Sequence, residues 1–300
     1  MLIETVLDAI GNTPMLKLAR MSEHSIFAKL ELLNPGGSIK DRVARHLIEA
    51  AEKRGEIGPD TVIVEASSGN TGIGIVLVGA MKGYRVIVVM PENMSEERKK
   101  IISALGGEMI LTPACDSLDG CLKKVYELRD SDPNVWVPHQ FENPDNPAIH
   151  YSQTAAEIWE QMDGKIDAFV AGVGSGGTLQ GVGKFLKEKD PDILSVAVEP
   201  RNVSALLGQE PGLHQIQGIG DGFIPAVLDV QLIDEVITVS DDEAVSTARE
   251  LAKKEGVLAG TSSGANVFAA LELAARIGNG KRIVTVLPDR AERYFSTALI

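Results

Sequence analysis

Short apolar runs rich in β-branched residues alternate along the chain with segments whose apolar residues recur at helical spacing. The runs at 61–66, 85–90 and 108–111 are continuous rather than alternating, as expected of strands buried on both faces. Helical patterns follow the first two runs, and Gly83 and Gly106 mark where those helices should end. This alternation predicts a parallel sheet with helices on both of its faces.

A second series of the same kind begins after a turn-rich stretch at 138–147. Strands are expected at 166–171, 194–198 and 282–287, and helices at 150–162, 178–187 and 240–256. The turn-rich stretch indicates a domain boundary or a functional loop, because both keep polar backbone at the surface. The predicted fold is therefore α/β, with two three-layer αβα domains, mainly parallel sheets and a cleft between the domains.

Residues 34–42 place Lys40 in the first turn of an expected helix. Ser38 and Asp41 have the spacing of a capping box, and an apolar face continues through Val43 and Leu47. The positive end of a helix disfavours an ammonium group and favours the neutral amine, which is a nucleophile. A lysine that extends into solvent is the ordinary alternative. Lys40 is the catalytic candidate if other segments supply a site around it.

A loop between an expected strand and helix carries hydroxyl and amide groups. Its residues are Ser67, Ser68, Gly69, Asn70, Thr71 and Gly72. Hydroxyls and backbone N–H groups that converge on a helix N-terminus suit a small carboxylate. An ordinary helix cap followed by turn residues is the alternative.

A second loop of this kind is rich in glycine. It contains Gly172, Gly174, Ser175, Gly176, Gly177 and Thr178. Backbone donors and hydroxyls before a helix predict a phosphate cradle. The glycines also satisfy the G-x-G-x-x-G fingerprint, and Glu199 ends the next strand, where a ribose-binding acid would lie. Alone, this loop does not separate NAD from another phosphate-bearing cofactor.

A third loop, at 260–266, places Ser262 at the start of a helix, where a plain cap is again the alternative. An NAD-dependent oxidoreductase would leave this loop, Lys40 and the loop at 67–72 without a role. Pyridoxal 5'-phosphate gives each of them one: an imine with lysine, a phosphate cradle, a carboxylate site and a hydroxyl for the ring nitrogen.

Composition narrows the classes of partner. The 29 basic and 42 acidic residues give a formal net charge of −13, which argues against nucleic acid or an anionic membrane. No apolar run approaches the roughly 18 residues of a membrane span, and Glu4 lies where a secretory signal carries basic residues. Cys115 and Cys121 fit neither a redox motif nor a zinc site, so reduced thiols in a cytoplasmic protein without a metal are expected.

Nine segments, taken in order, resemble those of the cysteine synthases (O-acetylserine sulfhydrylases), which are tryptophan-synthase-like, fold type II pyridoxal phosphate enzymes. The resemblance covers essentially the whole chain, and the segments are 11–14, 34–42, 67–72, 90–95, 140–147, 174–178, 218–220, 260–264 and 293–297. Each segment alone is weak evidence, but nine such segments in this order are highly specific for the family. The two cysteines match no motif.

The resemblance implies roles for individual residues. Lys40 would form the internal aldimine and move the α-proton. The other cofactor contacts would be Asn70 on the ring hydroxyl, Gly174 to Thr178 on the phosphate, Ser262 on the pyridine nitrogen, and Gly218 along the cofactor. The substrate carboxylate would be held by Ser67, Ser68, Gly69, Thr71 and Gln140.

The reaction implied is O-acetyl-L-serine and sulfide giving L-cysteine and acetate, with ping-pong kinetics through an aminoacrylate intermediate. O-phosphoserine sulfhydrylase and cystathionine β-synthase-like activities are the alternatives. Arg201 departs from the O-acetylserine branch, and a cation near the cleft could suit a phosphate leaving group, although a solvated loop charge is the plainer interpretation. The segment Pro288-Asp289-Arg290 departs from that branch too.

The resemblance also implies how the chain is divided and assembled. A smaller mobile domain at 41–148 would carry the carboxylate loop, and residues 1–40 with 149–300 would form the larger, cofactor-binding domain. A homodimer is expected. The C-terminal tail of serine acetyltransferase is a possible partner, docked in the same cleft.

Overall fold

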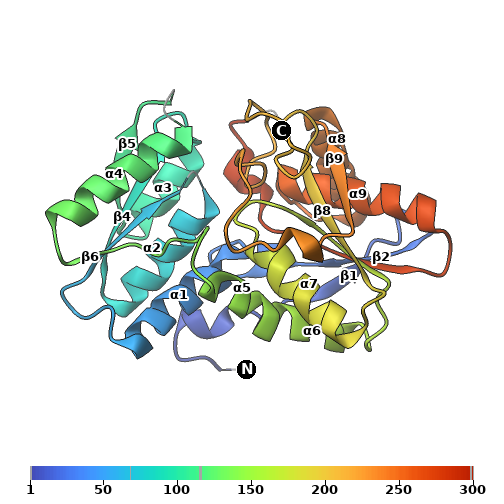
Figure 1. Cartoon of the computed structure of the whole chain (residues 1–300), viewed down its shortest axis with the longest axis horizontal. Helices are drawn as coiled ribbons and strands as arrows, with labels where there is room; N and C mark the ends of the chain where they lie inside the picture. Colours follow the sequence, from blue (N-terminus) through green and yellow to red (C-terminus); the bar gives the residue numbers. More distant parts are fainter. Residues whose placement is uncertain (1, 68, 115–116, 298, 300) are drawn as a thin grey trace.

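The computed structural model describes residues 2–67, 69–114, 117–297 and 299, and within them the strands form two sheets that lie side by side (Figure 1). The larger sheet has the strand order β1-β2-β10-β7-β8-β9, and the smaller has the order β5-β4-β3-β6. In the larger sheet β1 runs antiparallel to β2, while the pairs that follow are parallel. The pairs of the smaller sheet are all parallel.

Helices cover both faces of the larger sheet. Its strands are β1 (Met15–Lys17), β2 (Ser25–Lys29), β7 (Ala168–Gly172), β8 (Leu194–Pro200), β9 (Glu235–Val239) and β10 (Arg282–Val286). Side chains alternate, so Phe169 packs toward α6 (Ala155–Gln161) and α7 (Gly177–Lys189). Val170 packs toward α8 (Asp241–Glu255) and α9 (Thr261–Ile277) on the opposite face.

The smaller sheet is layered in the same way. Its strands are β3 (Val62–Ala66), β4 (Arg85–Pro91), β5 (Glu108–Thr112) and β6 (Val135–Trp136). On one face lie α1 (Lys40–Arg54), α2 (Asn70–Lys82) and α3 (Glu96–Ala104), and on the other lies α4 (Ser117–Ser131). The predicted fold class, two αβα sandwiches with mainly parallel sheets, is confirmed.

One expected helix begins earlier than the sequence indicated. The turn-rich stretch already contains α5 (Asp145–Ile149), which continues through a π-helical turn at His150–Thr154 into α6. Pro147 is accommodated because the first turn of a helix needs no donor from its backbone nitrogen. Apart from this start, the expected helices and strands agree with the observed ones to within a few residues, and α4, β6 and β9 were not predicted.

Cys121 lies in α4, buried against the smaller sheet, with its Sγ 3.1 Å from the hydroxyl oxygen of Thr112. Burial raises the pKa of this thiol. Cys115 lies outside the described residues. No helix in the described part of the chain is both long and apolar enough to cross a membrane.

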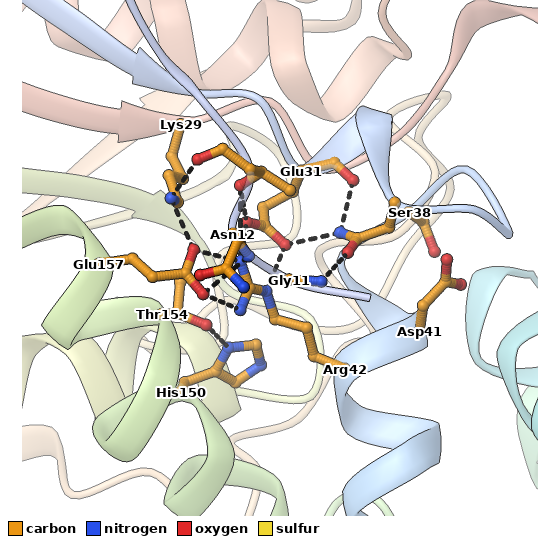
Figure 2. A network of polar contacts seen from close by, with 12 residues as sticks. Gly11, Asn12, Lys29, Glu31, Ser38, Asp41, Arg42, His150, Thr154 and Glu157 are labelled. Atoms are coloured by element: carbon orange, nitrogen blue, oxygen red, sulfur yellow. Dashed lines mark hydrogen bonds and ion pairs between the residues drawn. The ribbon is translucent and has the colours of Figure 1, made fainter. Parts of the chain in front are cut away.

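A buried network of charged side chains joins the start of α1 to elements of the larger sheet (Figure 2). Arg42, the third residue of α1, donates to both oxygens of Glu31 at 2.8 Å. On its other side it donates to both oxygens of Glu157, in α6, at 2.7 Å. Lys29, at the end of β2, lies 2.7 Å from the same Glu157 carboxylate.

The charges of this network are neutralised by one another, because solvent does not reach most of them. The side chains of Arg42, Glu31 and Lys29 are fully buried. Burial alone would raise the pKa of Glu157, but Arg42 and Lys29 lower it to about 2. Two-sided, bidentate pairing of this kind offsets the cost of desolvating each charge. The first turn of α1, a helix that covers the smaller sheet, is therefore fixed together with Lys40 to elements of the larger sheet.

Replacing Arg42 with Met should destabilise the protein by about 3–5 kcal/mol, because two carboxylates would be left in the interior with one cation fewer. Arg45→Met, on the same helix but partly exposed and paired with Glu49, should change stability by about 1 kcal/mol or less. Urea unfolding of both variants measures the difference. Equal losses would show that the network does not stabilise the fold.

Candidate active site

A cleft between the two sheets gathers the residues that the sequence singled out. Counting the part open to solvent, its volume is about 940 Å³, within the usual range for small-molecule sites. Predicted residues that line it are Lys40, Ser67, Gly69, Asn70, Thr71, Gln140, Gly174, Ser175, Gly176, Thr178, Gly218 and Ser262. Gly177 begins α7 directly behind this lining, and Ser68 lies outside the described residues.

Lys40 lies where the loops from the two sheets meet. Its Nζ donates to the hydroxyl of Ser175 at 2.7 Å and lies 3.4 Å from Oε1 of Gln140. Burial lowers the pKa of Lys40 to about 8, against the opposing charges of Asp221 and Glu65. The direction of this shift is the one expected from the sequence, but burial, not the helix end, is its main cause.

The capping box expected at Ser38 is not formed in the predicted way. The cap position is Ile39, and the Ser38 hydroxyl accepts from the backbone N–H of Lys40 at 3.2 Å, one residue earlier than the box requires. Asp41 accepts from the backbone N–H of Gly36 at 2.6 Å. The turn before α1 is therefore closed by local hydrogen bonds that hold Lys40 at the helix start.

The loop at 67–72 is organised by its own first serine. The Ser67 hydroxyl accepts from the backbone N–H groups of Gly69 and Gly72 at 3.1 and 3.0 Å. The Thr71 hydroxyl donates to Oε1 of Gln140 at 2.7 Å. These contacts place hydroxyl groups and the start of α2 at one wall of the cleft, as a carboxylate site requires.

Asn70 is held from the opposite side by two residues near the C-terminus. Its Nδ2 donates to Asp289 at 2.7 Å, and its Oδ1 accepts from Arg293. Asp289 is fully buried and also accepts from the hydroxyl of Tyr294. Asp289 therefore orients Asn70 and leaves one amide N–H of Asn70 for a ligand.

The glycine-rich loop ends in the first turn of α7. The backbone N–H groups of residues 175–178 donate to no other residue in the described part of the chain. A Cβ at Gly174 would collide with the carbonyl oxygen of Gly218, and one at Gly177 would collide with the side chain of Asn146. The loop thus offers free donors, and at Gly174 and Gly177 only glycine leaves the backbone in this position, which suits a phosphate group.

Asn146, in α5, connects this loop to Gln140. Its Nδ2 donates to the carbonyl oxygen of Gln140 at 2.7 Å and lies 3.0 Å from the hydroxyl oxygen of Ser175. Asn146 is fully buried, and these contacts satisfy its amide nitrogen, whereas its Oδ1 has no hydrogen-bond partner among the described residues. The carboxylate wall and the phosphate loop therefore share one side chain.

The third loop forms the first turn of α9. Ser262 lines the cleft, and the hydroxyl oxygens of Thr261 and Ser263 are buried without a partner among the described residues. Asn266 accepts from the backbone N–H of Gly172 at 2.8 Å and donates to the carbonyl of Val286 at 2.9 Å. This ties the start of α9 to the ends of β7 and β10.

Two other sequence candidates have structural partners away from the cleft. Glu199 is buried, and its carboxylate accepts from the hydroxyl of Ser204 and the backbone of Leu206, so it is not free to bind a ribose. Arg201 is exposed and pairs with Glu243 at 2.6 Å. The solvated charge was therefore the better interpretation of Arg201.

The family model described as pyridoxal-phosphate dependent enzyme matches residues 6–289. The chain belongs to this family of pyridoxal phosphate enzymes. A cysteine synthase of Staphylococcus aureus is 48% identical over 301 residues, which covers 99% of this chain and 97% of the relative.

Two solved structures extend the comparison. O-acetylserine sulfhydrylase isoform 3 of Entamoeba histolytica has a TM-score of 0.95 and 41% identity, and the match covers 100% of this chain and 92% of that one. An O-acetylserine dependent cystathionine β-synthase of Helicobacter pylori has a TM-score of 0.94 and 45% identity, covering 100% and 99%. The fold and the cofactor predicted from the sequence are confirmed.

The cleft fits pyridoxal phosphate on its own chemistry. The free N–H groups of residues 175–178 suit a doubly charged phosphate. Lys40, with its pKa lowered by burial, can supply a neutral amine to the aldehyde. Ser262 presents a hydroxyl on the same cleft. No group of three or more His, Cys, Asp or Glu residues among those described could hold a metal ion.

Sequence reasoning missed residues that belong to the site through contacts between distant segments. Arg98, in α3, lines the cleft, is 2% exposed, lies over the Tyr294 ring at 4.8 Å and donates to Gln217. Asp221 lines the cleft and its charge acts on Lys40. Glu65 lies inside the apolar run that forms β3. An acid at such a position was the local signal in the sequence that pointed to a further residue of the site.

Cofactor attachment to the cofactor-free protein should accelerate about tenfold between pH 7 and 9 and then level off, because a pKa of about 8 makes the amine mostly neutral at pH 9. Stopped-flow absorbance with added pyridoxal phosphate measures this rate, and Lys40→Ala should show no attachment. A rate that is still rising tenfold per pH unit at pH 10 would contradict a lowered pKa.

Proposed function

We propose that this protein is a cysteine synthase, which replaces the acetate of O-acetyl-L-serine with sulfide to give L-cysteine. The observation that carries the proposal is the position of Lys40, whose Nζ contacts the phosphate loop at Ser175 and approaches the carboxylate wall at Gln140. A cysteine synthase at 48% identity over nearly the full length supports it.

The bound cofactor supplies an aldehyde that binds amines and a ring that withdraws electrons from the α-carbon. Residues Gly174 to Thr178 would hold its phosphate, Asn70 and Ser262 would contact its ring, and Gly218 would line the cofactor site. The substrate carboxylate is held by Ser67, Ser68, Gly69, Thr71 and Gln140. Lys40 would hold the cofactor between turnovers, and its neutral amine would accept the α-proton of the amino acid and later return it. Donor and acceptor use one cleft in turn, so ping-pong kinetics follow.

The second candidate function uses another serine derivative as donor, or an acceptor other than sulfide. The Helicobacter pylori structure is named an O-acetylserine dependent cystathionine β-synthase, and it matches essentially the whole chain. Arg201 no longer supports a phosphate leaving group, because it pairs with Glu243. O-acetylserine is therefore preferred over O-phosphoserine as donor.

A movement of residues 41–148 toward the rest of the chain is part of this proposal, and the first turn of α1, where Arg42 is held by Glu31 and Glu157, would be its hinge. The smaller sheet carries the carboxylate wall, whereas the phosphate loop belongs to the larger sheet. Closure on an amino acid would exclude water from the reacting atoms. A radius of gyration that is unchanged by saturating O-acetylserine in X-ray scattering would count against it.

We also propose a homodimer, a cytoplasmic location and docking of the C-terminal tail of serine acetyltransferase in the cleft. The family resemblance supports each of them. Sedimentation of the purified protein tests the dimer, and cell fractionation tests the location. A tail peptide that neither binds nor competes with O-acetylserine would exclude the docking.

The proposed reaction predicts the absorbance of the loaded protein. Adding O-acetylserine should shift the visible band, adding sulfide should restore it with release of cysteine, and O-phosphoserine should act more slowly. Lys40→Ala should lose about 10³-fold or more in turnover. Lys53→Ala, at an exposed position of the same helix, is the control. A band that responds to neither serine derivative would refute the function.

A further inference from the structure

Glu65 is a carboxyl group in the middle of an apolar strand. It is the fourth residue of β3, whose five residues are all buried, and its own side chain is 2% exposed. It does not line the cleft. Instead it borders a separate cavity behind Gln140, which it shares with Tyr126, His139 and Glu142. A buried acid at such a position is costly unless a hydrogen bond compensates it.

Its hydrogen-bond partner is a residue of the proposed carboxylate site. Nε2 of Gln140 donates to Oε1 of Glu65 at 2.9 Å. The other end of the same amide, Oε1, accepts from Thr71 at 2.7 Å and faces Lys40 at 3.4 Å. Gln140 lines both cavities. The hydrogen bond that Glu65 accepts on the far side of Gln140 therefore affects how Gln140 faces the cleft.

The two ends of an amide are nearly equal in shape, and hydrogen-bond partners decide which end faces which way. Glu65 presents an acceptor oxygen, which selects the NH₂ end of Gln140. The carbonyl end is thereby turned toward the hydroxyl of Thr71 and the amine of Lys40. Without this acceptor, the amide would be held mainly on its Thr71 side, where a hydroxyl can pair with either end of the amide.

We propose that Glu65 is a positioning residue for the amino-acid substrate, acting by fixing the rotation of the Gln140 amide in the carboxylate site. This inference rests on the proposed function, because it assigns the geometry of that same site. It adds a residue that touches neither substrate nor cofactor.

Glu65 also acts on Lys40 through its charge, and this second effect must be separated from the first. Burial raises the pKa of Glu65 to about 8, so Glu65 is mostly ionised only above that pH. Where it is ionised, the carboxylate raises the pKa of Lys40, against the larger effect of burial. Removing the charge should therefore change proton transfer, which appears in kcat. Losing the acceptor should change substrate binding, which appears in KM and in the dissociation constant of the amino acid.

Two variants of the holoenzyme separate these effects. Glu65→Gln and Glu65→Met both remove the charge at similar volume, but only the glutamine keeps an acceptor oxygen for Gln140. Glu65→Met should raise KM and the spectroscopically measured dissociation constant for O-acetylserine about tenfold, whereas Glu65→Gln should stay within about threefold. Any change in kcat should be common to both.

A double-mutant cycle tests whether the effect passes through Gln140. In a Gln140→Ala background, Glu65→Met should cause no further change in KM. Asp60→Asn, an exposed acid just before β3, is the control for loss of one negative charge. Should Glu65→Met fail to fold, Glu65→Asp serves instead: it keeps the carboxyl group, withdraws the acceptor from Gln140 and should raise KM with kcat unchanged.

Equal KM values for Glu65→Met and Glu65→Gln, or additive effects in the cycle, would overturn the positioning role. In that case the wild-type protein still responds to O-acetylserine and the proposed function stands. A wild-type protein whose absorbance responds to no amino acid would overturn the function, and this inference with it.

Discussion

The paired carboxylates around Arg42 are the constraint on which the site depends. Arg42 belongs to a helix that covers the smaller sheet, yet its charge is balanced by Glu31 and by Glu157, which lie with the larger sheet. Breaking either pair would leave a charge inside the protein, so the three groups move together or not at all. Lys40, two residues earlier, is held by the same arrangement at the boundary between the sheets.

The electrostatics of the cleft differ from those of the whole chain. The protein has a formal net charge of −13, but the cleft is lined by Lys40 and Arg98 as well as by Asp221. The free N–H groups at the start of α7 add further positive potential. The carboxylate of the zwitterionic amino acid and the phosphate of the cofactor therefore meet local attraction in a protein whose overall charge is negative.

Local signals made much of this predictable from the sequence. Strand and helix periods, glycines after helices, and loops rich in hydroxyls depend on neighbouring residues, and so they placed most strands of both sheets and the three loops that line the cleft. Contacts between distant segments were out of reach. Nothing near Asn70 indicates that Asp289 orients it, and nothing near Gln140 indicates Glu65. The helix expected from residue 150 begins earlier, with α5, and this start was missed because the prolines of the stretch usually indicate a loop.

The side chain shared by the two walls of the cleft has a thermodynamic consequence. Asn146 donates to the carbonyl of Gln140 and contacts the hydroxyl of Ser175, so a ligand that disturbs either contact disturbs the other. Linkage of this kind is reciprocal: if cofactor phosphate tightens the binding of the amino acid, the amino acid must tighten the hold on the cofactor by the same factor. The hold on the cofactor phosphate and the hold on the substrate carboxylate are therefore coupled through Asn146, although the two groups bind at different walls of the cleft.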